Sequence, residues 1–122
     1  MIYRLLKLKN AIKKSWGIDT AYKDDVPKWS NDNPAAGQCA VTALIIHSYF
    51  GGQIYSGVSQ DKVVHYWNKI HGFKIDLTRK QFKETKTFSD ITEWNAEKLM
   101  ETGNVKDRYE ILRSRVERYL NQ

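Results

Sequence analysis

The sequence predicts an α+β fold in which a buried central helix packs on a small antiparallel sheet. The stretch around residues 36–50 is apolar almost all round, which is typical of a buried helix. The runs at about 62–70 and 73–78 are separated by His71-Gly72, and because Gly accepts positive φ, this pair favours a tight hairpin turn. Helical spacing of apolar residues at both ends of the chain predicts one N-terminal and two C-terminal flanking helices.

Length and charge place limits on the protein. Its 122 residues are typical of one domain, 1–122, and can build a core without disulfides or metal. The net charge of +6 admits an acidic protein, a nucleic acid or an anionic membrane, but the basic residues are scattered. A single cysteine excludes an internal disulfide and suits a reducing compartment. With no signal peptide and no apolar run of transmembrane length, we expect a cytoplasmic protein that does not enter membranes.

The N-terminal half is predicted to contain two helices separated by a loop. Residues 2–15 carry apolar side chains at helical spacing with lysines between them, and this predicts an amphipathic helix. Residues 18–33 are rich in Asp, Asn, Ser and Pro, which indicates a loop. Asn33 can cap a helix and Pro34 suits its first position, so the central helix is expected to run from about 36 to 50.

The C-terminal half is predicted to complete the sheet and then to turn helical. A short strand is expected around 53–55, followed by a Ser/Gly turn and then the hairpin. One helical turn is expected at 78–82. Two helices follow, at about 91–102 and at about 105–120. The first is predicted from the helical spacing of Ile91 and Trp94 with later apolar residues, and the second from an apolar stripe that starts at Val105.

The hairpin brings a histidine and a carboxylate together. If Ile70 pairs with Phe73, His65 lies opposite Thr78 and shares a face with Asp76 on a diagonal. Diagonal neighbours are roughly 7–8 Å apart at the backbone, which a His–Asp hydrogen bond can span. The opposite face is predicted to be the buried one, and it carries Val64, Tyr66, Ile70, Phe73, Ile75 and Leu77.

Cys39 falls near the start of the central helix, where the positive end of the helix dipole favours a thiolate. A thiolate near an imidazole is the ion pair that thiol acyl transfer requires, and an acid beside the imidazole fixes its orientation. Backbone N–H groups at the same helix start can bind an oxyanion. Cys39, His65 and Asp76 are therefore the candidate catalytic residues.

Two segments carry a family resemblance. NPAAGQCAVTAL (33–44) and HYWNKIHGFKIDLT (65–78), followed by Gln81-Phe82, resemble the YunG-like bacterial proteins, an uncharacterised family, and the resemblance runs from about Lys13 to Val116. The order of a helix-borne Cys, a strand-borne His and then an Asp is also similar to papain-like and transglutaminase-like folds. That similarity implies a nucleophile at Cys39, a base at His65 and an orienting group at Asp76.

The papain-like resemblance also implies an oxyanion side chain and a pocket. Papain-like peptidases place a Gln several residues before the Cys; here position 33 is Asn, so Gln38 or Asn33 would take that role. Trp67 and Trp29 are candidate pocket walls, although core packing is the more common fate of a Trp. The chain is short for such enzymes, which disfavours an endopeptidase that reads an extended peptide.

Structural explanations compete with these roles. A free Cys is often simply buried, and Asp76 can cap the helical turn at 78–82. The spacing of the three His and one Cys matches no metal motif and no phosphate loop is present, so we expect neither metal nor cofactor.

Two functions remain open. One is a thiol-dependent acyl transferase or amide hydrolase acting on a small amide or ester or on a protein side chain. The other is a non-catalytic binding module whose basic surface contacts an acidic protein or, less favoured, a nucleic acid. Accessibility of the Cys39 sulfur in a concave site would distinguish the two.

Overall fold

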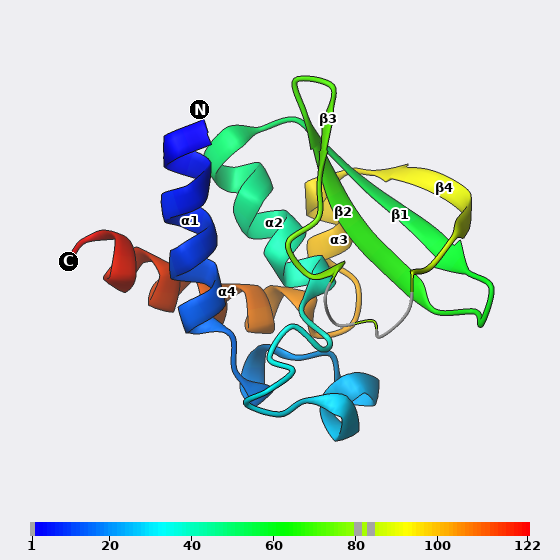
Figure 1. The fold of residues 1–122 in the computed structure, drawn as a ribbon, viewed down its shortest axis with the longest axis horizontal. Coiled ribbons are helices and arrows are strands. Elements are labelled where there is room, and N and C mark those ends of the chain that lie inside the picture. Colours follow the sequence, from blue (N-terminus) through cyan, green and yellow to red (C-terminus); the bar gives the residue numbers. More distant parts are fainter. Residues whose placement is uncertain (1, 80–81, 83–84) are drawn as a thin grey trace.

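The computed structural model describes residues 2–79, 82 and 85–122 and confirms the α+β class. Helices gather on one side of a twisted sheet (Figure 1). In chain order the elements are α1 (Ile2–Ser15), the short 3₁₀ helices η1 (Ile18–Thr20) and η2 (Lys23–Lys28), α2 (Cys39–Phe50), β1 (Gln53–Ser59), β2 (Val64–Ile70), β3 (Phe73–Ile75), β4 (Phe88–Trp94), α3 (Ala96–Met100) and α4 (Val105–Leu120).

The sheet has the strand order β3-β2-β1-β4, and every neighbouring pair is antiparallel. The predicted hairpin register is confirmed, because Ile70 pairs with Phe73 and Asn68 with Ile75. The β2–β3 ladder ends at the pair Asn68–Ile75. His65 and Thr78, which the same register places opposite each other, therefore lie beyond the last pair.

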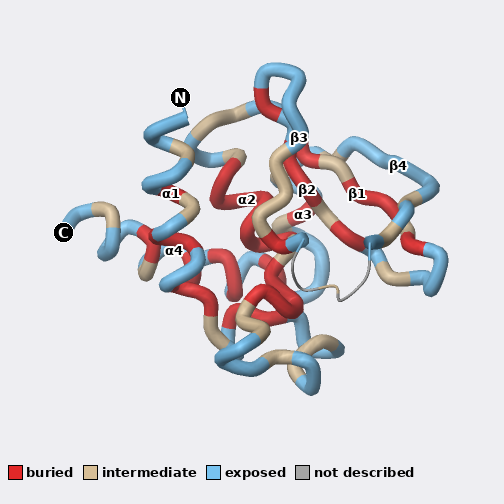
Figure 2. Tube along the Cα trace, in the orientation of Figure 1, coloured by how far each residue is buried: buried red, intermediate tan, exposed pale blue. Residues whose placement is uncertain are grey.

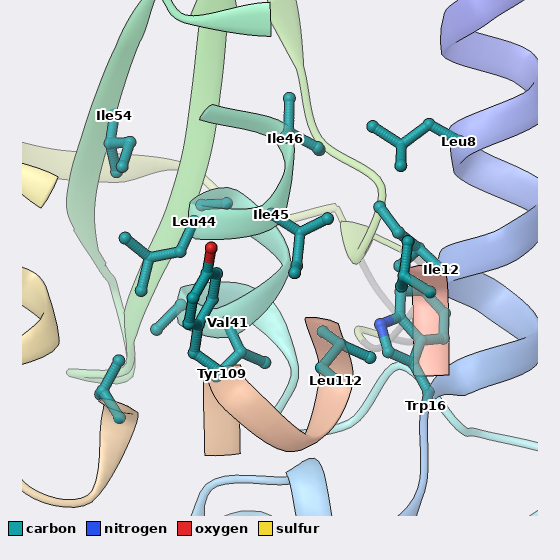
Figure 3. Packing of buried hydrophobic residues seen from close by; sticks show 14 of the residues in the cluster. Leu8, Ile12, Trp16, Val41, Leu44, Ile45, Ile46, Ile54, Tyr109 and Leu112 are labelled. Carbon is teal, nitrogen blue, oxygen red and sulfur yellow. The ribbon is translucent and has the colours of Figure 1, made fainter. Parts of the chain in front are cut away.

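α2 is the centre of the molecule, as predicted. Every residue from Ala40 to Ile46 is buried, and Figure 2 shows this middle part of the helix in red. One side of α2 contacts β2 and β1, and another contacts α4, which packs on α1. Figure 3 shows the residues that meet in this core, among them Leu8 and Ile12 of α1, Val41, Leu44, Ile45 and Ile46 of α2, Ile54 of β1, and Tyr109 and Leu112 of α4.

The two long flanking helices are also confirmed. α1 spans the predicted residues 2–15, and α4 spans the predicted residues 105–120. After α1, Trp16 is buried and its Nε1 donates to Thr42 Oγ1 of α2 at 2.9 Å, so that its polar atom has a partner in the core. This bond ties the end of α1 to the first turn of the central helix.

The predicted start of the central helix, at about residue 36 after Asn33-Pro34, is wrong. The helix begins at Cys39, and residues before it form turns. The cause is Gly37, whose φ of +74° is left-handed and breaks a helix. A Cβ at this position would come within 2.7 Å of the Tyr22 backbone nitrogen, so a glycine is needed for the loop to cross here. Cys39 thereby becomes the first residue of α2.

The first strand is longer than predicted, because the Ser/Gly turn expected after residue 55 is part of β1. Gly57 lies inside the strand, where a Cβ would meet Phe88 at 2.7 Å and Trp67 at 2.9 Å. The glycine therefore allows two aromatic residues to approach the sheet closely, and the register of β1 with β4 shifts at the same place.

The predicted helix at 91–102 is wrong in its first half. Ile91 and Trp94 belong to β4, and the helix that follows, α3, is short. Asn95 separates the two elements, since its side chain accepts hydrogen bonds from the backbone N–H groups of Glu97 and Lys98 and so fixes the helix start. The strand adds a fourth member to the sheet, where Trp94 Nε1 donates to Ser56 Oγ at 2.7 Å.

The face of the hairpin predicted to be buried is only partly so. Val64 and Phe73 are 48% and 68% exposed, while His65 and Trp67 on the opposite face are 1% and 8% exposed. The reason is that Phe88 of β4 covers the second face, with ring centroids 5.4 Å and 5.5 Å from those of His65 and Trp67.

Part of the helical turn predicted at 78–82 lies outside the described residues. Among the residues that are described, no helix combines the length and the apolar character needed to cross a bilayer.

Candidate active site

Cys39 occupies the first position of α2 and is half-buried. The first N–H groups of a helix have no carbonyl acceptor within it, and the helix dipole makes this end positive. Cys39 also lines a cavity of about 440 Å³, together with Gly37, Ala40 and residues of the β1–β2 turn, β2 and the start of α4. Cys39 thus lies at a helix start beside open space and is not sealed in the core.

His65 and Asp76 form the contact that the hairpin register predicted. His65 Nε2 lies 2.7 Å from Asp76 Oδ2. The other carboxylate oxygen, Asp76 Oδ1, accepts the backbone N–H and the hydroxyl of Thr78, both at 3.3 Å. Asp76 therefore serves both roles considered from the sequence, since it holds the imidazole and also closes the turn that follows it.

Cys39 is, with Asp76, one of the two residues whose side chains favour the charged form of His65. Burial lowers the pKa of His65, but the hydrogen bonds and negative charges of Asp76 and Cys39 outweigh that effect and raise it from 6.5 to about 9. Electrostatics therefore favours an imidazolium between a carboxylate and a sulfur.

Aromatic rings enclose the imidazole. Phe88 stacks on His65 with an interplanar angle of 20°, Phe82 meets it edge-on at 5.0 Å, and Trp67 lies 6.1 Å away. These rings exclude water and restrict rotation of the imidazole, so its Nε2 keeps its direction toward Asp76.

The wall of the Cys39 cavity is partly apolar and partly charged. Tyr22 and Tyr66 supply aromatic surface and Val64 aliphatic surface. Arg108 of α4 is a cation on this wall and is only 5% exposed. Asp25 is a half-buried anion on the same wall, and burial is the main cause that raises its pKa.

The two proposed oxyanion side chains are engaged elsewhere. Gln38 is fully buried; its Oε1 accepts from Thr20 Oγ1 at 2.8 Å and its Nε2 donates to the Gly17 carbonyl at 2.9 Å. Asn33 Nδ2 donates to the Lys28 carbonyl at 3.1 Å, and Asn33 lines a different cavity, on the side of Asp76. Neither side chain lines the Cys39 cavity, and Gln38 instead anchors the start of α2 to the loop after α1.

The two candidate tryptophans do not line the Cys39 cavity either. Trp67 packs behind His65 against Phe88 and lies under the Lys74 ammonium, 4.5 Å from the ring centroid. Trp29 Nε1 donates to the Pro34 carbonyl at 3.2 Å and so holds the loop before α2. Both positions are consistent with the packing alternative.

The sequence interpretation missed Arg108. A signal was present, since Arg108 sits three and four residues from Val105 and Leu112 and therefore on the buried stripe of α4. A charged residue at a core-facing helical position is rare unless it is paired or lines a site.

Within the described residues, no group of three or more His, Cys, Asp or Glu side chains is arranged to hold a metal ion.

Fold and site define a small α+β protein with a cysteine at a helix start beside a buried His–Asp pair. The family model described as "YunG protein" matches residues 4–121. The "Uncharacterized protein YunG" of Bacillus subtilis (strain 168) is 32% identical over 114 residues, which cover 93% of this chain and 92% of that protein. The chain belongs to the YunG family. No solved structure matches it significantly, so the similarity to papain-like and transglutaminase-like folds stays an interpretation.

Proposed function

We propose that this protein is a thiol-dependent acyl transferase or amide hydrolase that uses Cys39, His65 and Asp76. The observation that carries the proposal is the position of His65, whose Nε2 lies 2.7 Å from Asp76 Oδ2 and whose charged form is favoured by both Asp76 and Cys39. The open cavity at Cys39 supports it, because a nucleophile must be reachable by its substrate.

In the proposed reaction the Cys39 thiolate attacks the carbonyl carbon of an amide or ester, forming a C–S bond while the carbonyl electrons move to oxygen. The N–H groups at the start of α2 stabilise this oxyanion. As the intermediate collapses, the bond to the leaving group breaks and the His65 imidazolium donates its Nδ1 proton to the departing amine or alcohol. Asp76 orients the ring in both steps.

The resulting thioester is then resolved by an acceptor. A water or an acceptor amine attacks the thioester carbonyl while His65 Nδ1 takes the proton of the attacking group. The C–S bond breaks, the acid or new amide leaves, and the thiolate–imidazolium pair is restored. Hydrolase and transferase thus differ only in which acceptor reaches the cavity.

The first test is acylation by 4-nitrophenyl acetate, followed by intact-mass measurement. We expect one acetyl group on Cys39, released by neutral hydroxylamine as a thioester is, and a burst of nitrophenolate. Acetylation of surface lysines is measured in Cys39→Ala, which should show no hydroxylamine-sensitive adduct. His65→Ala should form the thioester far more slowly, because the thiolate loses its counter-ion.

Absence of both a hydroxylamine-sensitive adduct and Cys39-dependent release of nitrophenolate in the folded wild-type protein would contradict the proposal. It would favour the alternative, a non-catalytic binding module with a basic surface. The proposal would also be contradicted if His65→Ala formed the thioester as fast as the wild type, since the histidine would then play no part in the chemistry.

A further inference from the structure

We propose that Arg108 binds a carboxylate of the substrate beside Cys39, so that the substrate is a small amide or ester that carries a free carboxylate. This inference rests on the proposed function and names the substrate class of the same site. It is carried by the cavity, by the bonding of Arg108 and by the charges on the surrounding walls.

Arg108 is held rigidly from three directions. Its Nε donates to Asn104 Oδ1 at 2.9 Å, and its Nη1 donates to the Thr20 carbonyl at 3.1 Å and the Gly37 carbonyl at 3.5 Å. The ring of Tyr22 lies 5.8 Å from the guanidinium carbon. A guanidinium fixed in this way is preorganised, so a ligand does not have to restrict its rotation on binding.

One end of the guanidinium is left available. Nη2 of Arg108 makes no hydrogen bond within the described part of the chain. It is not among the fully buried atoms without a partner there, so part of its surface stays accessible to solvent. The space next to Arg108 is the cavity that Cys39 lines. Nη2 carries two N–H groups, and such a donor on a charged guanidinium gives a charge-assisted hydrogen bond to a carboxylate.

No carboxylate is bonded directly to Arg108, although Asp25 acts on its charge from beyond ion-pair distance. All its hydrogen-bond acceptors are neutral oxygens, and no ion pair includes it among the residues that the structure describes. A buried cation that lacks a directly bonded counter-ion is unfavourable, and an anion that binds it in the cavity relieves this cost. Burial is the main cause that lowers the pKa of Arg108, and it outweighs the opposing effect of Cys39, Tyr22 and Asp25.

The two acidic residues on the same wall have other partners. Asp24 accepts the Tyr22 hydroxyl at 2.9 Å, and Asp25 lies 3.9 Å from the Lys28 ammonium. Neither forms an ion pair with Arg108 in the described structure. The cavity, at about 440 Å³, is within the usual range for small ligands, roughly 300–1,000 Å³. It therefore suits a small carboxylate better than a long peptide.

The test compares two alkylating agents that differ only in charge. Iodoacetate carries a carboxylate next to the reacting carbon, and iodoacetamide is its neutral counterpart. We measure the rate with iodoacetate divided by the rate with iodoacetamide, both for Cys39 and for the free thiol N-acetylcysteinamide, and compare the two ratios. The measurements are made at high salt to screen the overall positive charge of the protein. We expect the wild-type ratio to exceed the free-thiol ratio by about 10-fold, the size of one charge-assisted contact.

Variants assign the preference to Arg108. In Arg108→Gln the ratio should fall toward that of the free thiol, while Lys62→Gln, which removes an exposed cation on the same cavity, should keep it. If circular dichroism shows that Arg108→Gln does not fold, two other measurements decide. One is the ratio in Arg108→Lys. The other compares how far N-acetylglycine and its neutral counterpart N-acetylglycinamide slow the alkylation of wild-type Cys39. Arg108→Lys should lower the ratio, and only N-acetylglycine should protect.

The outcomes separate this inference from the function beneath it. Fast reaction with iodoacetamide but a wild-type ratio no higher than that of the free thiol overturns the carboxylate site and leaves the acyl-transfer proposal standing. A raised ratio that Arg108→Gln or Arg108→Lys leaves unchanged assigns the preference to the imidazolium of His65 and also overturns it. Slow reaction with iodoacetamide at every pH is instead a failure of the proposed function.

Discussion

Replacing His65 by alanine is expected to slow the alkylation of Cys39 by iodoacetamide at about pH 6 by a factor of roughly 10 to 100. A free thiol has a pKa of about 8.5 and is almost entirely protonated at that pH. In the proposed pair, the imidazolium keeps the sulfur as a thiolate, and the gain is partly offset because a stabilised thiolate is a weaker nucleophile. The chain has one cysteine, so total alkylation reports this site alone.

A matched control separates the pair from a general effect of losing a histidine. His71 lies in the β2–β3 turn, is exposed and has a φ of +50°, which Asn tolerates well. His71→Asn should therefore label at the wild-type rate. Equal labelling of wild type and His65→Ala at about pH 6 would mean that the imidazole does not stabilise a thiolate, and the proposed chemistry would be withdrawn.

The largest expected loss of stability comes from Ile45→Ala in the middle of α2. Ile45 is fully buried among residues of several elements (Figure 3), so the substitution removes apolar contacts and leaves a cavity. Truncations of this kind cost about 2–5 kcal/mol in the free energy of unfolding. We expect the midpoint of urea unfolding to fall accordingly, with little change in the slope of the transition.

Ile111→Ala is the matched control, because it removes the same atoms from another long helix. Ile111 is 38% exposed, so this change should cost less than about 1 kcal/mol. If the two variants unfold at the same urea concentration, α2 is not the centre of the core, and the account of how Cys39 is held in place fails with it.

The helices and the hairpin were predictable because each has a strong local signal. The lysine-rich helix at 2–15 and the helix at 105–120 have regular apolar stripes, and their predicted bounds hold. The turn at His71-Gly72 fixed the hairpin register, and the register brought His65 to Asp76. The central part of the candidate site thus followed from short-range geometry.

The errors arose where contacts distant in sequence decide the structure. Ile91 and Trp94 have helical spacing, but their segment pairs with the edge of β1 and therefore forms the strand β4. Gly57 lies inside a strand, where the absence of a side chain leaves room for aromatic residues of other strands. The central helix starts late because Gly37 crosses the backbone of Tyr22. None of these partners can be identified from local sequence.

The surroundings of the cysteine were the least predictable part. Gln38 and Asn33 were considered for the oxyanion from their closeness in sequence to Cys39, yet their side chains bond to other loops. Arg108 reaches the cavity from α4, far along the chain. A pocket wall is assembled by packing, so its members can be found only once the helices are placed.

The most direct test of the central claim is a titration of the His65 ring by NMR, assigned by comparison with His65→Gln. The pKa of His65 is raised, so its ring should stay protonated between pH 6.5 and about 9, where an ordinary imidazole is neutral. Cys39→Ser and Asp76→Asn should each lower the midpoint, because each removes a negative partner. A wild-type midpoint near 6.5, unchanged by Cys39→Ser, would contradict the thiolate–imidazolium pair.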